Sequence, residues 1–266
     1  ATGFRQAIDA VERSTRALLK ELPDGEVEAD GFMDDDGRGG PPTRIHARLI
    51  KEQDRLTVDL SGSASQVSGA FNVPWASTRA AVVYALRAMT DPSITANDGL
   101  LRPLRIVCPR GSVLNPDPPA AVSVRHNTCQ RLADVLVRAF SDLWPNSAVA
   151  SSTVTFAAMN LSSSAPGSGR RSVLSDVLGG GTGAQADGPG LDGVDTYMAN
   201  VRLMPVEVAE TNYSVRVLRT ELIEGSQGRG AFDGGRGIRR EYLILDGPEV
   251  ATYYAEQTNE RFRPSG

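Results

Sequence analysis

Apolar residues recur at three- and four-residue spacing in three segments of the chain, which predicts three amphipathic helices. The first extends from Phe4 to Leu22 and is ended by Pro23-Asp24-Gly25. The second covers Trp75 to Met89. The third covers about Thr128 to Leu143, with Thr128 as its N-cap, and its apolar residues form one continuous face.

Strict alternation of apolar and polar residues predicts strands elsewhere. Arg44 to Leu49 and Arg55 to Leu60 alternate, and the polar Lys51-Glu52-Gln53-Asp54 joins them, which indicates an antiparallel hairpin with one wet face. Leu104 to Cys108 is expected to form a short buried strand. Further strands are expected at 152–158, 172–178, 212–222, 238–245 and 249–255. The fold class that follows is α+β, with mixed and largely antiparallel sheets, two or three long helices and glycine-rich loops.

Glycine-dense turns separate these elements, above all in Leu178-Gly179-Gly180-Gly181-Thr182-Gly183-Ala184. Such a run allows the backbone to approach a ligand or another strand closely. It lacks the lysine of a phosphate-binding loop, and no helix-opening glycine fingerprint follows it. Residues 162–171, rich in serine, glycine and proline, are expected to form a flexible loop within one domain spanning 1–266.

Composition narrows the possible functions. A chain of 266 residues with 40% hydrophobic content can bury a sizeable core. A net charge of −4 and a pI near 5.3 argue against nucleic acid as a partner. The sequence contains no 18-residue apolar run and no signal pattern, so a cytoplasmic protein with no membrane partner is expected. Cys108 and Cys129 are expected to be reduced.

The residues with catalytic potential are few. His46 occupies a polar position of an alternating strand and is expected to face solvent, whereas His126, expected ahead of the third helix, could face a pocket. Neither histidine has a partner at metal-ligand spacing, and Asp34-Asp35-Asp36-Gly37 is interpreted as a solvated acidic turn. Asp59 and Ser61 at a strand end could either hold a polar substrate or satisfy turn amides.

Several spaced motifs resemble those of the hydantoinase B/oxoprolinase family. Asp59-Leu60-Ser61-Gly62-Ser63, with Gln66, Gly69 and Asn72, resembles the family's D-[FL]-x-G-[ST]-x-x-Q-x-x-G-x-x-N stretch. Asn97-Asp98-Gly99 with Arg102-Pro103, the glycine run, and the segment from Gly228 to Gly237 continue the resemblance in the family's order. Asp233 stands where the family usually has arginine, so this position cannot supply a guanidinium group.

The resemblance implies a substrate-side component of an ATP-dependent cyclic-amide hydrolase of the hydantoinase or 5-oxoprolinase type. Alternatives are a component of an ATP-dependent ketone carboxylase and a non-catalytic scaffold half. ATP and a divalent metal are expected in partner segments, with no cofactor bound by this chain. The expected partners are a hydantoinase A-type ATP-binding subunit, the N-terminal half that B-type subunits carry and this chain lacks, and a small-molecule substrate.

Six residues are the candidates for substrate contact, and their catalytic roles are not specified. The amides of Gln66 and Asn72 could orient an amide substrate, and Arg125 could pair with a carboxylate or phosphate. Gly180 and Gly181 could offer backbone N–H donors, and Asp59 could contribute a carboxylate.

Overall fold

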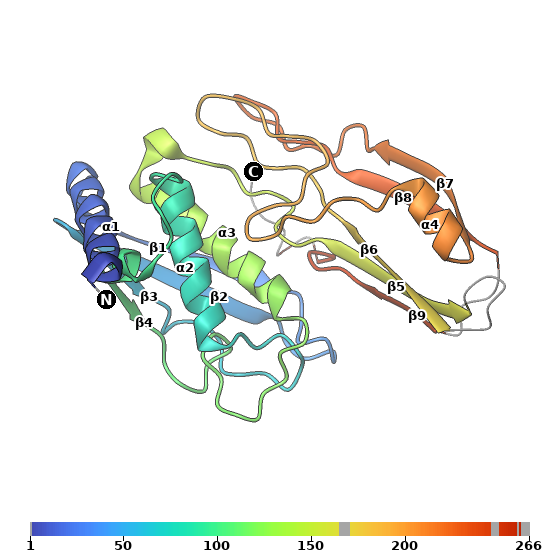
Figure 1. The fold of residues 1–266 in the computed structure, drawn as a ribbon, viewed down its shortest axis with the longest axis horizontal. Helices are drawn as coiled ribbons and strands as arrows, with labels where there is room; N and C mark the ends of the chain where they lie inside the picture. The colour runs from blue at the N-terminus through green and yellow to red at the C-terminus, as the bar shows by residue number, and fades with distance from the viewer. Residues whose placement is uncertain (1, 165–170, 246–249, 260, 262–266) are drawn as a thin grey trace. The chain divides into compact units, whose positions relative to one another are not determined.

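Antiparallel strand pairing dominates the computed structural model of the chain, which describes residues 2–164, 171–245, 250–259 and 261 (Figure 1). Contacts divide the chain into two units, Ala1–Val149 and Ala150–Gly266. Helices and mixed, mostly antiparallel sheets together confirm the predicted α+β class. The expectation of one domain spanning 1–266 stays a prediction.

A four-stranded sheet with the order β1-β2-β3-β4 forms the first unit. Its strands are β1 (Gly25–Met33), β2 (Thr43–Glu52), β3 (Arg55–Asp59) and β4 (Leu104–Val107). The β2–β3 pair is antiparallel, which confirms the predicted hairpin, while β3 and β4 run parallel. Lys51 belongs to β2 rather than to the connection and is buried, and β4 is half-buried rather than buried.

Three helices accompany this sheet: α1 (Thr2–Glu21), α2 (Trp75–Met89) and α3 (Arg125–Leu143). Short 3-10 turns, η1 (Asp98–Leu101) and η2 (Pro145–Ser147), complete the unit. All three predicted helices are confirmed. The N-cap prediction was wrong, because α3 begins three residues earlier and the Thr128 hydroxyl instead donates to the backbone oxygen of Phe71 at 2.7 Å.

The core of this unit consists of apolar residues at alternate strand positions and along the inner faces of α2 and α3. Ile45, Ala47 and Leu49 of β2 point inward, while Leu136 and Phe140 are among the α3 residues that are fully buried. Strand β1 carries glutamate and aspartate at its other positions and had not been predicted. Its Gly31 lies under α3, where a Cβ would clash with side chains of that helix.

The second unit contains a three-stranded and a two-stranded sheet. The first has the order β6-β5-β9, from β6 (Arg171–Leu178), β5 (Ala157–Ser164) and β9 (Val250–Tyr254). The second pairs β7 (Val215–Leu222) with β8 (Ile238–Ile244), and α4 (Val206–Asn212) precedes it. A core cluster of Leu161, Leu174, Ala209 and Val215 joins these elements.

Two sequence predictions in this unit need correction or fall outside the structure. The strand expected at 152–158 starts only at Ala157, because the preceding residues turn sharply, with Val154 at a φ of 59°. Of the loop expected at 162–171, residues 162–164 belong to β5 and residue 171 belongs to β6. Residues 165–170 lie outside the described residues. No helix of the described residues has both the length and the apolarity that crossing a membrane requires.

Candidate functional site

Two loops that follow the parallel strands β3 and β4 pack together in the first unit. The first covers residues 60–73 and the second covers residues 108–124, and they are called the paired loops below. The Gln66 N–H donates to the Gly111 oxygen at 2.8 Å, and the Val73 N–H donates to the Val113 oxygen at 2.7 Å. The paired loops therefore lie side by side at the carboxyl ends of the parallel pair β3 and β4.

Asp59, the last residue of β3, makes a local turn contact. Its Oδ1 accepts the Ser61 backbone N–H at 2.9 Å. Partial burial opposes ionisation of this carboxyl, but hydrogen bonds from Ser61 outweigh it and lower the pKa of Asp59. The sequence left two roles open for this strand end, substrate binding and hydrogen bonding to turn amides. The structure shows the second, because Asp59 accepts the Ser61 amide. Binding of substrate by Asp59 stays a prediction.

Gln66 and Asn72 use their amides to hold the paired loops together. The Gln66 Oε1 accepts the Asp117 N–H at 2.7 Å. Asn72 is fully buried, and its Nδ2 lies within 2.8–3.1 Å of three backbone oxygens, including that of Ala121 in the other loop. Its Oδ1 accepts the Val67 N–H at 2.9 Å. Both residues therefore position the loops, and their contact with substrate stays a prediction.

Arg125 and His126 begin α3, directly after the second paired loop. The Arg125 side chain is exposed, with one donor 3.2 Å from the Val122 oxygen. His126 lies within the helix rather than ahead of it and is half-buried. Burial, reinforced by the charge of Arg125, lowers the pKa of His126, so its imidazole is neutral at neutral pH. Arg125 is thus the exposed cation of this helix end.

Gly180 and Gly181 belong to the second unit, whereas the other four candidate residues belong to the first. The Gly180 N–H donates to the Val194 oxygen at 3.2 Å and is thus used within the fold. A Cβ at Gly181 would overlap the backbone of Gly235, so close backbone packing requires this glycine. A cavity of about 20 Å³ beside Gly179 has room for one water molecule and not for a substrate.

His46 does not face solvent as expected, and this prediction was wrong. Only 9% of the residue is exposed, because Gly62 packs directly against the imidazole ring and the Ser63 hydroxyl bonds the His46 backbone. The His46 Nδ1 lies 3.0 Å from Asp30, which also forms two hydrogen bonds with Arg44 at 2.7 and 2.9 Å. The Arg44 guanidinium, opposed by partial burial, lowers the pKa of Asp30.

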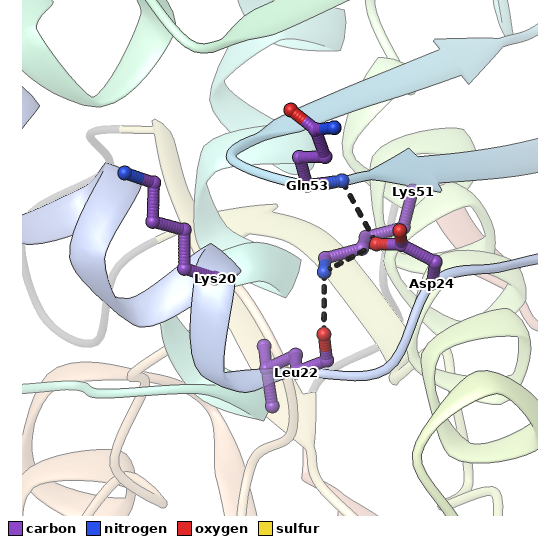
Figure 2. Close-up of a pocket in the computed structure, with 5 residues that line it drawn as sticks. All are labelled: Lys20, Leu22, Asp24, Lys51 and Gln53. Carbon is purple, nitrogen blue, oxygen red and sulfur yellow. Dashed lines mark hydrogen bonds and ion pairs between the residues drawn. The ribbon is translucent and has the colours of Figure 1, made fainter.

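A hollow of about 480 Å³ lies where α1 meets the β2–β3 turn, lined by Lys20, Leu22, Asp24, Lys51 and Gln53 (Figure 2). The buried Lys51 ammonium donates to the Leu22 backbone oxygen and to Asp24 Oδ1, the latter at 2.7 Å. Figure 2 shows the Lys20 ammonium pointing away from this pair. Lys51 therefore satisfies a carbonyl just beyond α1, which is the role of a helix cap.

The acidic turn at residues 34–37 is bonded internally rather than fully solvated. Asp36 is buried and accepts hydrogen bonds from the backbone of Gly40 and Arg38 and from the Ser68 hydroxyl, which together lower its pKa despite burial. Within the described ranges, no group of three histidine, cysteine, aspartate or glutamate residues could hold a metal. The location of ATP and of a metal in partner segments stays a prediction.

Both cysteines are free. Burial raises the pKa of the Cys129 thiol to about 11 and raises that of Cys108 as well. A thiol of this kind is protonated at neutral pH and is a poor nucleophile.

Known proteins share sequence and fold with this chain. The sequence profile described as hydantoinase B/oxoprolinase matches residues 1–266. The chain belongs to this family. A putative B-type subunit of a D-/L-hydantoinase from Pseudomonas sp. (strain NS671) is 32% identical over 271 residues, covering 96% of this chain and 44% of that protein. The 5-oxoprolinase of Dictyostelium discoideum is 35% identical over 216 residues, covering 80% of this chain and 16% of that protein.

Solved structures show the same fold at lower identity. The ATP-dependent caprolactamase from Pseudomonas jessenii superimposes with a TM-score of 0.75 at 24% identity, covering 89% of this chain and 42% of that one. The nucleotide-free acetone carboxylase structure gives a TM-score of 0.74 at 17% identity, covering 91% and 35%. The chain thus spans less than half the length of each of these four proteins.

Among the residues that the sequence interpretation missed, Asn127 in the first turn of α3 is the most informative for function. It is 1% exposed, and its Oδ1 has no hydrogen-bond partner among the described residues. Polar Gln130, Arg131 and Asp134 follow at helical spacing and are also buried. The signal in the sequence was a polar stripe at i, i+3, i+4 and i+7, which is the usual pattern of a solvent-facing helix side.

Proposed function

We propose that this chain is the substrate-side component of an ATP-dependent hydrolase of cyclic amides. The observation that carries the proposal is the match over 96% of the chain to a protein named as a putative B-type hydantoinase subunit, with a match over 80% of the chain to a 5-oxoprolinase. In this scheme a hydantoinase A-type partner binds ATP and phosphorylates the amide carbonyl oxygen. The carbonyl of a ring amide is a poor electrophile, and phosphorylation supplies it with a good leaving group.

The chemistry of the described residues supports a role in binding rather than in bond breaking. Arg125, the first residue of α3, offers an exposed guanidinium next to the paired loops, and both thiols are protonated at neutral pH. ATP and a divalent metal are assigned to partner segments, as the family resemblance implies. We place the substrate near the start of α3, where Arg125 could pair with a carboxylate or with the phosphate of an activated substrate.

Ketone carboxylation is the second candidate, supported by the fold shared with acetone carboxylase. A scaffold role is the third, supported by the structural bonds of Gln66, Asn72 and Gly180. One assay distinguishes cyclic-amide hydrolysis, ketone carboxylation and the scaffold role. The full-length B-type chain, assembled with its A-type partner, is tested for ATP hydrolysis stimulated by hydantoin, by 5-oxoproline, or by acetone with bicarbonate. Stimulation by a cyclic amide supports the proposal, stimulation by the ketone alone replaces it, and none from an intact complex favours the scaffold.

The substitution Arg125→Ala tests the position of the site. Loss of one charge-assisted hydrogen bond to substrate is expected to lower kcat/KM roughly 10- to 100-fold while the complex stays assembled. Arg110→Ala is the matched control, because Arg110 is an exposed arginine of the paired loops whose guanidinium is held by Asp117 at 2.6 Å. Unchanged kinetics in Arg125→Ala would remove this residue from the site.

A further inference from the structure

The side-chain amide of Asn127 is enclosed by protein but unused by it. The residue is 1% exposed, and no described residue donates a hydrogen bond to its Oδ1. Its backbone is satisfied, since the Asn127 N–H donates to the Val124 oxygen at 3.1 Å. Burial of a carbonyl oxygen without a donor is unfavourable, and native proteins largely avoid it. The oxygen is therefore suited to receive a donor from outside the chain.

Asn72 shows that this neighbourhood can satisfy a buried amide completely. It is fully buried in the paired loops, and its amide makes four hydrogen bonds to backbone groups. The same loops adjoin α3, because the Thr128 hydroxyl donates to the Phe71 oxygen at 2.7 Å. The two asparagines thus differ. The Asn72 amide is fully hydrogen-bonded within the paired loops, whereas the Asn127 Oδ1 accepts no hydrogen bond from the described residues.

The first turn of α3 contains both exposed and buried side chains. Arg125 is exposed, His126 is half-buried, and Asn127 is buried. Side chains two residues apart on a helix do not face each other, so the Arg125 guanidinium and the Asn127 amide are separate contacts. His126 between them is neutral at neutral pH, so Arg125 supplies the charge and Asn127 the uncharged hydrogen-bonding groups.

We propose that the Asn127 carboxamide binds the amide edge of a cyclic substrate and selects for the cis amide of the ring. This inference rests on the proposed function. A small lactam or imide ring holds its amide cis, so the ring N–H and C=O lie side by side on one edge. A side-chain carboxamide carries one acceptor and adjacent donors, so it can accept from the ring N–H and donate to the ring C=O at once. An open-chain secondary amide is almost always trans, and a ketone lacks the N–H.

Paired ligands test the proposal by binding alone, without turnover. Hydantoin and 1,3-dimethylhydantoin share a ring, but the second has no N–H. Calorimetry on the full-length B-type chain assembled with its A-type partner gives the ratio of their dissociation constants. The wild-type complex is expected to bind hydantoin at least about tenfold more tightly, since the analogue leaves the buried Oδ1 unpaired.

Substitution of Asn127 is then expected to abolish this preference. In Asn127→Ala the ratio of dissociation constants should fall to about 1, with KM for hydantoin raised roughly 10- to 100-fold and kcat changed less. Asn127→Ser serves if the alanine variant does not assemble, because serine cannot span both ring groups. The matched control is Thr128→Val, which removes a neighbouring buried polar group bonded within the protein and should leave the ratio unchanged.

The outcomes separate this inference from the proposed function. A preference for hydantoin that survives in both Asn127 variants overturns the inference, and a water molecule then accounts for the buried oxygen. Cyclic amides that stimulate ATP hydrolysis equally in wild type and Asn127→Ala overturn it while the proposed function stands. Asn127-dependent binding without stimulation of ATP hydrolysis supports the inference and contradicts the proposed hydrolysis. No binding of hydantoin to the intact wild-type complex overturns the inference.

Discussion

A buried ion pair in the second unit supports a quantitative prediction of stability. The Arg240 side chain of β8 is 0% exposed and lies 3.3 Å from Asp176 of β6, which is 3% exposed. The Tyr242 hydroxyl donates to the same carboxylate oxygen, and the Arg240 guanidinium lies 5.3 Å from the Tyr242 ring centre. Two further guanidinium nitrogens of Arg240 have no hydrogen-bond partner among the described residues. Asp176 is thus the anion that compensates this buried cation.

The substitution Asp176→Ala removes that compensation. Breaking a buried pair from one side costs about 3–5 kcal/mol, because the remaining charge is left uncompensated. Loss of the acceptor for Tyr242 adds about 1 kcal/mol. A total of about 4–6 kcal/mol is a large part of the stability of an ordinary domain. The double variant Asp176→Leu with Arg240→Met removes both charges and should lie within about 1 kcal/mol of wild type or above it.

The assay uses the uneven distribution of tryptophan in the chain. Both tryptophans, Trp75 and Trp144, belong to the first unit, so their fluorescence follows unfolding of that unit. Far-ultraviolet circular dichroism in urea follows both units, and hydrogen exchange of β6 and β8 follows the second. Asp176→Ala should lower the midpoint for the second unit. A cost under about 1 kcal/mol, or a double variant as unstable as the single one, would refute the reasoning.

The same cluster gives a pH dependence of known sign. Burial, with hydrogen bonding to Asp176, raises the pKa of Tyr242 well above its ordinary value. Above about pH 10 the unfolded tyrosine loses its proton while the folded one keeps it, so the free energy of unfolding falls as pH rises. The slope from this group is about 1.4 kcal/mol per pH unit. Tyr242→Phe should remove that component, and an unchanged alkaline slope would contradict the assignment.

Two further predictions concern other parts of the chain. Gly181→Ala should lower the stability of the second unit by at least about 2 kcal/mol, because the added methyl would overlap the backbone of Gly235. Gly188→Ala, where a Cβ meets nothing within 4 Å, should stay within about 0.5 kcal/mol in the same urea titration; equal effects would disprove the steric argument. Acid unfolding of the first unit, followed by tryptophan fluorescence, should begin at higher pH in Arg44→Met. Arg44 lowers the pKa of Asp30, so this stabilisation is present above about pH 4 and is lost as pH falls through the lower, folded-state pKa; identical acid curves would argue against it.

The elements that could be predicted from the sequence are those whose pattern is local. The regular spacing of apolar residues predicts the helix at Trp75–Met89 and the β2–β3 hairpin. In the folded chain these same apolar residues face the core. Strand β1 was missed because glycines and acidic residues interrupt its alternation. Gly31 within it is dictated by the side chains of α3 that pack over it, a contact with a segment about a hundred residues away in the sequence. Such a requirement is not visible in local spacing.

The candidate site was predictable only as a set of residue types. Gln66 and Asn72 were singled out for their amides, but the sequence could not show whether these amides face a ligand or hold the paired loops together. His46 follows the pattern of an exposed strand position and is nevertheless buried, because a loop 16 residues later covers it with Gly62. Burial of a polar side chain depends on tertiary packing, and alternation along one strand does not encode it.

The contrast between used and unused polar groups is a sharper guide to candidate binding residues than residue type is. Four side chains have the chemistry of ligand-binding groups but form hydrogen bonds within the protein: Asn72, Gln66, Lys51 and Asp36. Substitution of any of them would primarily destabilise the fold. A residue that contacts substrate must keep hydrogen-bonding capacity free in the folded chain. Asn127, with its buried and unpaired oxygen, meets that condition close to the exposed Arg125. For this reason the start of α3, rather than the glycine run, is where substitutions should alter substrate preference without first unfolding the protein.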